Sequence, residues 1–82
     1  MFFVYIIESQ KDGSYYIGQT SDIEKRLMSH NSGQTRSTKG KIPWNVVYTE
    51  EYSNRKDAIV RERFLKKQRN REFYKRLIKQ MP

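Results

Sequence analysis

The sequence feature that most constrains the fold is the stretch from Tyr15 to Asn31, in which a strand pattern is followed at once by a helix pattern. Gly18 lies inside the strand pattern, where a glycine is costly unless a backbone, a helix or a ligand approaches closely. Ser21 and Glu24 have the spacing of a capping box, so we expect a helix that begins near Asp22. The stretch therefore predicts a strand, a turn and a helix in immediate succession.

This helix carries two chemically active side chains beside its apolar stripe. At about 100° per residue, Ile23, Leu27 and His30 share one face, and Arg26 lies at the edge of that face. An arginine one turn before a histidine is well placed to hold a phosphate, because a guanidinium is always charged and forked. A helical arginine is also commonly a plain surface residue, and a lone helical histidine is commonly structural. The pair alone leaves both interpretations open.

The other segments predict an α+β fold, a small three-stranded antiparallel sheet flanked by three helices in the order ββαβαα. The expected elements are strands over Phe2–Glu8 and Ser14–Gln19, a helix over about Asp22–Asn31, a strand over Trp44–Tyr52, and two helices capped by Asn54 and Asn70, the first of which ends near Gln68. Trp44 is interpreted as a core or rim anchor in preference to a platform for base stacking.

Two connections matter for function. Asp12-Gly13 supplies the turn of a hairpin that brings Tyr5 close to Tyr15 or Tyr16, and the register that decides between them stays open. After a helix stop at Gly33, the polar segment Ser32–Lys41 is expected to be a mobile loop. Arg36, Lys39 and Lys41 would then be free to contact a phosphate backbone. The alternative is that the segment only connects its neighbours.

Length and cysteine content bound the class of protein. The 82 residues predict a single domain over residues 1–82, whose aromatic side chains supply much of a small core. There is no cysteine, which excludes disulfides and thiolate zinc sites and favours a reducing compartment. No signal-peptide pattern is visible, and the longest apolar run, Met1–Ile7, is too short to span a bilayer. We therefore expect a cytoplasmic protein that does not insert into a membrane.

The net charge of +8 comes entirely from the end of the chain. Residues 1–54 hold six basic and six acidic residues, whereas residues 55–82 hold eleven basic and three acidic ones. Such a block suits a polyanion, and nucleic acid is the commonest polyanion in a cytoplasm. The alternatives are a solvated helix surface that serves solubility, or a surface for an acidic protein partner. No phosphate-binding loop, dinucleotide fingerprint, nucleophile elbow or His/Cys metal spacing is present.

Glu62 is the most informative carboxylate because it interrupts the apolar stripe formed by Ala58 and Leu65. A buried charge is expensive unless it is paired or bound to a cation. Glu62 is therefore either in an ion pair, with Arg26, Arg61 or another of the many cations, or a ligand to one Mg²⁺. A single carboxylate suffices for Mg²⁺ when waters and a substrate phosphate complete the octahedron.

Taken together, these residues resemble the GIY-YIG nuclease family. Tyr16-Ile17-Gly18 matches the second tripeptide of that family, and Phe3-Val4-Tyr5 stands at the first, with Phe3 in place of the glycine. Asp22–Leu27 is similar to the arginine-bearing helix of the family, and Ala58–Glu62 to its glutamate-bearing helix. The resemblance covers nearly the whole chain. It is closest to the short standalone branch, small bacterial proteins often named by analogy after the incision subunit of excision repair.

The resemblance implies an endonuclease that hydrolyses nucleic-acid phosphodiester bonds with Mg²⁺ or Mn²⁺, on DNA in preference to RNA, by a single-metal mechanism with a tyrosine-assisted water. We expect Tyr16, or failing that Tyr5, to orient or deprotonate this water. The catalytic residues that it implies are Tyr5, Tyr16, Arg26, His30 and Glu62, with Glu62 as the metal ligand. The cations that we expect on flanking phosphates are Arg36, Lys39, Lys41, Arg61, Lys66, Lys67 and Arg69. Asn70 is interpreted as a helix cap. The alternative function is a non-catalytic, basic nucleic-acid-binding module on the same scaffold.

Overall fold

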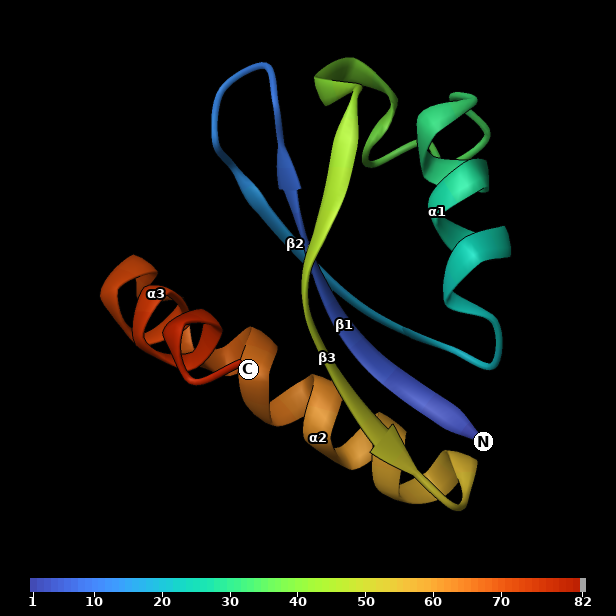
Figure 1. Ribbon diagram of the computed structural model, residues 1–82, viewed down its shortest axis with the longest axis vertical. Coiled ribbons are helices and arrows are strands. Elements are labelled where there is room, and N and C mark those ends of the chain that lie inside the picture. Colours follow the sequence, from blue (N-terminus) through green and yellow to red (C-terminus); the bar gives the residue numbers. More distant parts are fainter. Residues whose placement is uncertain (82) are drawn as a thin grey trace.

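The computed structural model describes residues 1–81 and has the predicted α+β fold, with a three-stranded antiparallel sheet and helices packed on it (Figure 1). Its elements are β1 (Phe2–Ser9), β2 (Tyr15–Thr20), α1 (Ile23–Asn31), a short 3-10 helix η1 (Lys39–Lys41), β3 (Trp44–Tyr52), α2 (Arg55–Gln68) and α3 (Arg71–Lys79). The predicted order ββαβαα is confirmed. Across residues 1–81, no helix combines the length and the apolar character needed to cross a membrane.

The register of the sheet settles which tyrosines share a face. The strand order is β2-β1-β3, so β1 is central and pairs with both neighbours. Tyr5 lies opposite Gly18, and Ile7 lies opposite Tyr16. Directly opposed residues project to the same face of a sheet. Tyr16 therefore shares a face with Tyr5, whereas Tyr15 projects to the other face and packs edge-on against Tyr74.

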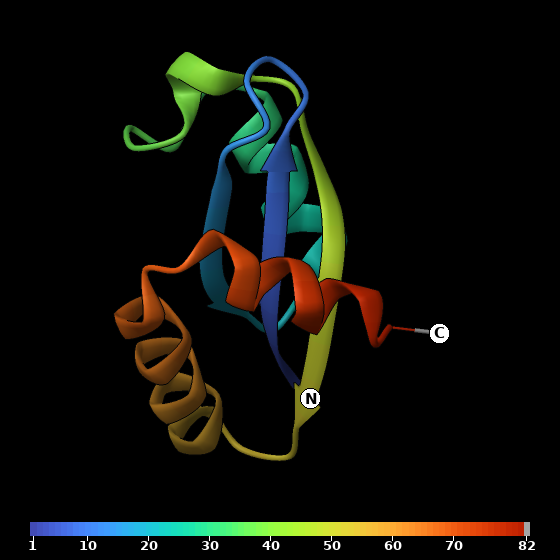
Figure 2. The ribbon, with the colours of Figure 1, turned by 90° about the vertical axis from the view of Figure 1, so that its left-hand side faces the viewer.

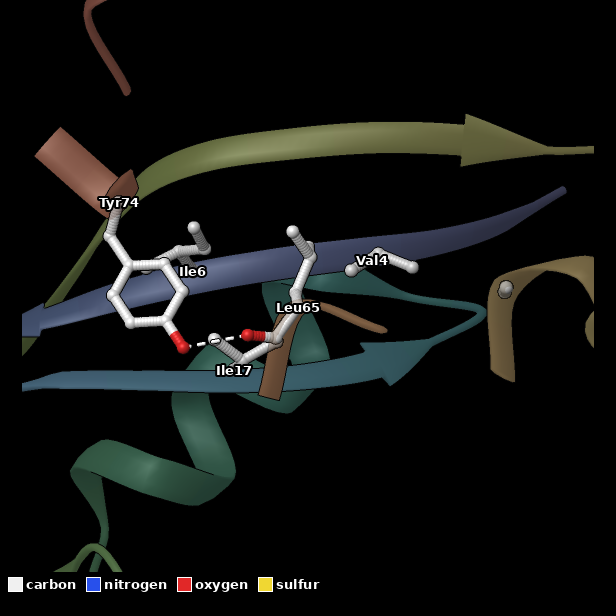
Figure 3. Packing of buried hydrophobic residues seen from close by; sticks show 6 residues of the cluster. Val4, Ile6, Ile17, Leu65 and Tyr74 are labelled. Atoms are coloured by element: carbon white, nitrogen blue, oxygen red, sulfur yellow. Dashed lines mark hydrogen bonds between the residues drawn. The ribbon is translucent and has the colours of Figure 1, made fainter. Parts of the chain in front are cut away.

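The two faces of the sheet are covered by different helices. Figure 2 shows α1 behind the sheet and α3 in front of it, with α2 beside the lower part of β2. On the α2/α3 face, strand residues such as Val4 and Ile6 pack against Leu65 and Tyr74, and the Tyr74 hydroxyl donates to the Leu65 carbonyl at 2.6 Å (Figure 3). On the α1 face, Tyr5, Ile7 and Trp44 form a second buried cluster, which Ile23 and Leu27 cover. Trp44 is thus a core residue, as predicted.

Each α-helix begins at a capping side chain. Asn54 accepts a hydrogen bond from the backbone N–H of Asp57, and Asn70 accepts from two backbone N–H groups, so both predicted caps are confirmed. The predicted capping box on Ser21 is wrong, because Asp22 caps α1 and its carboxylate accepts from the N–H of Lys25. An aspartate caps a helix as well as a serine does, and Ser21 lies one residue too early.

The segment between α1 and β3 is more ordered than the sequence suggests. Gly33 has a φ of +82° and follows the end of α1, as expected of a helix stop. Beyond it, however, η1 interrupts the predicted loop, and Thr38 is fully buried. The Thr38 carbonyl accepts from the Trp44 indole N–H at 3.0 Å, and the Ser9 hydroxyl donates to the Lys41 carbonyl at 2.7 Å. The prediction of a plain mobile loop is therefore wrong here, because these hydrogen bonds tie the segment to β1 and β3.

Candidate active site

Tyr5 occupies the centre of the α1 face and explains Gly18 on the neighbouring strand. The Tyr5 side chain lies across Gly18, where an added Cβ atom would sit 2.6 Å from Tyr5 Cζ. Real Cβ atoms do not come this close to a ring carbon, so only glycine leaves room for the phenol. A close approach at Gly18 is present as predicted, but the approaching group is a side chain of the protein and not a backbone, a helix or a ligand. Tyr5 is 2% exposed, and its hydroxyl is directed toward α1.

Two side chains of α1 meet the hydroxyl of Tyr5. His30 Nε2 lies 2.9 Å from Tyr5 Oη, and Arg26 Nε donates to the same oxygen in a long hydrogen bond of 3.4 Å. The other ring nitrogen of His30, Nδ1, lies 2.8 Å from the hydroxyl oxygen of Thr38. His30 is fully buried. Three of the catalytic residues that the resemblance implies, Tyr5, Arg26 and His30, thus form one hydrogen-bonded group.

Burial keeps both members of the Tyr5–His30 pair neutral near pH 7. It lowers the pKa of His30, and the positive charge of Arg26 lowers that pKa further. Burial raises the pKa of Tyr5, against the effect of Arg26, whose hydrogen bond and charge both lower it. An uncharged imidazole next to an uncharged phenol can accept the phenol proton, which a protonated imidazole cannot do.

Tyr16 lies in the same cluster, on the edge strand. Its ring stands edge-on to the His30 ring, with centroids 5.2 Å apart, and edge-on to Trp44 at 6.4 Å. Lys66 Nζ lies 5.9 Å from the centroid of the Tyr16 ring. Tyr16 is half-buried, whereas Tyr5 and His30 are buried. The contact with Lys66 also shows that α2 reaches this part of the sheet.

Glu62 comes to the site from α2. Its side chain is only 18% exposed, and its carboxylate forms an ion pair with Lys66 at 3.5 Å, one turn further along the helix. The same carboxylate is close enough to the tyrosine cluster that its charge contributes to raising the pKa of Tyr5. Glu62 therefore lies within electrostatic range of Tyr5, and the ion-pair partner that the structure gives it is Lys66.

The donor atoms at this site suit a metal ion that takes few of its ligands from the protein. Within residues 1–81, no three acidic, histidine or cysteine side chains are grouped so that they could hold an ion together. Glu62 would be the one carboxylate ligand, since His30 already uses both ring nitrogens in hydrogen bonds. This donor set fits Mg²⁺ or Mn²⁺ that keeps most of its shell as water and substrate phosphate, and it does not fit a protein-caged zinc or calcium ion.

A hollow lies beside Arg26 at the N-terminal part of α1. It has a volume of about 240 Å³, and its lining residues are Thr20, Ser21, Asp22, Lys25, Arg26 and Ser29. Arg26 is half-buried, so its guanidinium connects this open hollow with the buried hydroxyl of Tyr5. A guanidinium held in this way presents its remaining N–H donors to an anion in the hollow.

The predicted phosphate-binding cations fall into two groups. Three of them already have acidic partners, since Arg61 grips Glu50 with two nitrogens at 2.9 and 3.0 Å, Lys41 pairs with Asp12 at 3.3 Å, and Lys66 pairs with Glu62. The other four, Arg36, Lys39, Lys67 and Arg69, are exposed and have no acidic partner among residues 1–81. Arg61 lies on the α2/α3 side, next to Tyr48 and Tyr52, and its contacts indicate a role in anchoring α2 to β3.

The sequence reasoning missed Thr38. A threonine in a polar stretch eight positions after the histidine gives no periodic or motif signal. Its burial depends on the turn that η1 makes and on Trp44, neither of which can be read from local pattern. A polar residue that precedes a buried tryptophan by six positions is the sole hint in the sequence, and it is not specific.

The fold and this group of residues are those expected of a nuclease-type domain, and comparison with known proteins identifies the family. The sequence matches the GIY-YIG catalytic domain family over residues 1–76, so the chain belongs to that family. It is similar to a UPF0213 protein of Streptococcus pneumoniae, with 35% identity over 68 residues that cover 82% of this chain and 68% of that protein. It is also similar to UPF0213 protein CPE1444 of Clostridium perfringens, with 41% identity over 68 residues that cover 82% and 72% of the two chains.

A solved structure supports the same relationship. The solution NMR structure of UPF0213 protein BH0048 from Bacillus halodurans matches with a TM-score of 0.57 and 32% identity, over 96% of this chain and 84% of that one. Membership of the GIY-YIG family supports a nucleic-acid endonuclease role for the chain.

Proposed function

We propose that this chain is an endonuclease that hydrolyses a nucleic-acid phosphodiester bond with the help of one Mg²⁺ or Mn²⁺ ion. The observation that carries the proposal is the buried contact of 2.9 Å between Tyr5 Oη and His30 Nε2, with Arg26 on the same oxygen. A phenol with an imidazole acceptor on one side and a guanidinium on the other is equipped to handle a proton next to an anion. The preference for DNA rests on the resemblance to the incision subunit.

Between the two tyrosines, the contacts favour Tyr5 as the general base. As Tyr5 Oη takes a proton from the attacking water, its own proton passes to Nε2 of His30, and the electron pair of the broken water O–H bond forms the new bond to phosphorus. The bond to the leaving oxygen then breaks, and that oxygen takes a proton from solvent. Tyr16 has no such acceptor within the described residues, and its half-buried ring stands edge-on to His30.

The remaining residues act on the phosphate. Arg26 binds the scissile phosphate from the hollow beside α1 and stabilises the charge that develops on its oxygens. Glu62 would hold the metal ion, which supplies positive charge at the phosphate and lowers the barrier to attack. The exposed cations Lys67, Arg69, Arg36 and Lys39 bind flanking phosphates without reading bases.

The test is a cleavage assay with matched carboxylate variants. Purified protein is incubated with labelled linear, nicked and branched DNA and RNA, in Mg²⁺, in Mn²⁺ and in chelator. We expect Glu62→Gln to reduce metal-dependent cleavage by about 100-fold or more, since an electrostatic group at the reacting phosphate is lost, while salt-sensitive binding persists. Glu72→Gln is the control, because Glu72 is exposed and pairs only loosely with Lys75 at 3.9 Å. Undiminished cleavage by Glu62→Gln would refute the assignment.

One observation favours the rival function of a non-catalytic binding module. Lys66 neutralises Glu62 in the structure, and a lysine that stayed there would hold the carboxylate away from a metal ion. In that case the protein would bind nucleic acid with a strong salt dependence, and no divalent metal would produce turnover. Binding would also be indifferent to Glu62→Gln. The same cleavage assay therefore separates the two functions.

A further inference from the structure

The hydroxyl of Tyr5 has one acceptor available. Its oxygen has hydrogen-bond contacts with His30 Nε2 and Arg26 Nε among residues 1–81, and Arg26 can only donate. Since the hydroxyl is buried, its proton needs a partner inside the protein. That partner is the lone pair of Nε2, so neutral His30 must carry its hydrogen on Nδ1.

The Nδ1–H group in turn needs an acceptor, and Thr38 provides it. Thr38 Oγ1 lies 2.8 Å from Nδ1, and the Thr38 hydroxyl donates its own hydrogen to the Thr35 carbonyl at 3.3 Å. The hydrogen bonds thus run in one direction, from Arg26 to Tyr5, to His30, to Thr38 and to the Thr35 carbonyl. The opposite tautomer would leave the Tyr5 proton without an acceptor among these residues.

We propose that Thr38 is a positioning residue that holds neutral His30 as the Nδ1–H tautomer, so that Nε2 is free to take the proton of Tyr5. The consequence for cleavage rests on the proposed function, whereas the tautomer itself does not. When Nε2 receives the proton, His30 becomes a cation whose Nδ1–H still donates to Thr38 and whose Nε2–H donates back to Tyr5. No group has to rotate during the transfer.

Thr38 is itself held from three sides, which makes it a reliable acceptor. Its side chain is fully buried, its backbone N–H donates to the Thr35 carbonyl at 3.1 Å, and its carbonyl accepts from the indole of Trp44. The N–H of Lys41 donates to the same carbonyl at 3.1 Å. The segment after α1 therefore contributes to the site through one hydroxyl, although it bears none of the residues that the family motif predicts.

The experiment reads the tautomer directly. His30 is the sole histidine of the chain, so long-range ¹H–¹⁵N correlation spectra of uniformly ¹⁵N-labelled protein at about pH 7.5, where a histidine is neutral, report on this ring alone. We expect hydrogen on Nδ1 in the wild type and in Thr38→Ser, and a shift toward hydrogen on Nε2 in Thr38→Val. In the cleavage assay, Thr38→Val should lower kcat by about 10- to 100-fold with KM for the nucleic acid unchanged, and Thr38→Ser should restore most of the rate.

The matched control is Ser9→Ala, which removes another buried hydroxyl that holds the same segment but does not touch His30. It should leave the tautomer as in the wild type, even if the protein loses stability. Hydrogen on Nε2 in the wild type would overturn the proposal, and so would a Thr38→Val protein with an unchanged tautomer. If Thr38→Val does not fold, the wild-type and Thr38→Ser spectra still decide whether the hydrogen lies on Nδ1, as proposed, or on Nε2. If no metal produces cleavage, the proposed function fails while the tautomer result stands.

Discussion

His30 is a buried base whose ordinary titration range falls near neutral pH. The surroundings that lower its pKa are the desolvating core formed by Tyr5, Tyr16 and Thr38, and the positive charge of Arg26. In this position the uncharged form is the one that fits both hydrogen bonds. Neutral His30 therefore fits its surroundings, whereas protonated His30 destabilises the folded chain.

This has a measurable effect on stability. Because the pKa of His30 is lower in the folded chain than the value of about 6.5 in an unfolded one, the unfolded chain binds the proton first. The contribution of His30 to the free energy of unfolding is fully present above about pH 6.5 and is lost as the pH falls from there to the pKa of the folded chain. The loss is about 1.4 kcal/mol for each unit by which the two pKa values differ. Urea unfolding between about pH 7.5 and pH 4.5 should show this slope, and His30→Gln should flatten it.

Gly18 allows a second residue-scale prediction. Gly18→Ala places a methyl group against the Tyr5 ring, so we expect a loss of about 1–3 kcal/mol in the free energy of unfolding, together with loss of cleavage, because the phenol is pushed away from His30. Gly40→Ala is the control, since no atom lies within 4 Å of the position of its added Cβ. Urea unfolding and the cleavage assay measure both effects. Equal stability of the two variants would mean that Tyr5 does not lie across Gly18.

At the scale of elements, α2 packs on the sheet through one side and presents cations to solvent on another. Its inner side packs Ala58 and Leu65 on the sheet, and Arg61 ties it to Glu50 of β3, a carboxylate that also accepts from Tyr48 and Tyr52. Burial and the hydrogen bond to Glu50 raise the pKa of Tyr48 to about 12, so this cluster stays intact over the physiological range. Lys67, near the end of α2, is exposed and has no acidic partner among residues 1–81.

We therefore expect Lys67 and Arg61 to behave differently. Lys67→Ala should weaken binding to duplex DNA regardless of sequence and reduce the slope of log K against log salt by about 1, because one phosphate contact is lost. Arg61→Met should leave that slope unchanged and instead lower the free energy of unfolding by about 1–2 kcal/mol, because Glu50 loses its charged partner. Fluorescence anisotropy between about 50 and 200 mM salt, and urea unfolding, measure the two effects. A reduced salt slope for Arg61→Met would place its guanidinium on nucleic acid.

At the scale of the whole molecule, the sequence predicted the elements better than the contacts between them. Strand composition and the Asn54 and Asn70 caps are local signals, and they specify the order ββαβαα without tertiary information. The choice between Tyr15 and Tyr16 depends on strand register, which only the pairing of β1 with β2 decides. The burial of Thr38 and the partner of Arg61 depend on segments far apart in the chain, so no local pattern could predict them.

Glu62 and the Tyr5–His30 pair are contributed by helices and strands on different faces of the sheet. Tyr5 and His30 lie on the α1 face of the sheet, whereas Glu62 lies on α2, which packs against the other face. A change confined to α2 can therefore remove the acid and leave the phenol and the imidazole where they are. We expect such a chain to fold and to keep its positive surface while losing the proposed cleavage, because the acid and the Tyr5–His30 pair are carried by different elements of the fold.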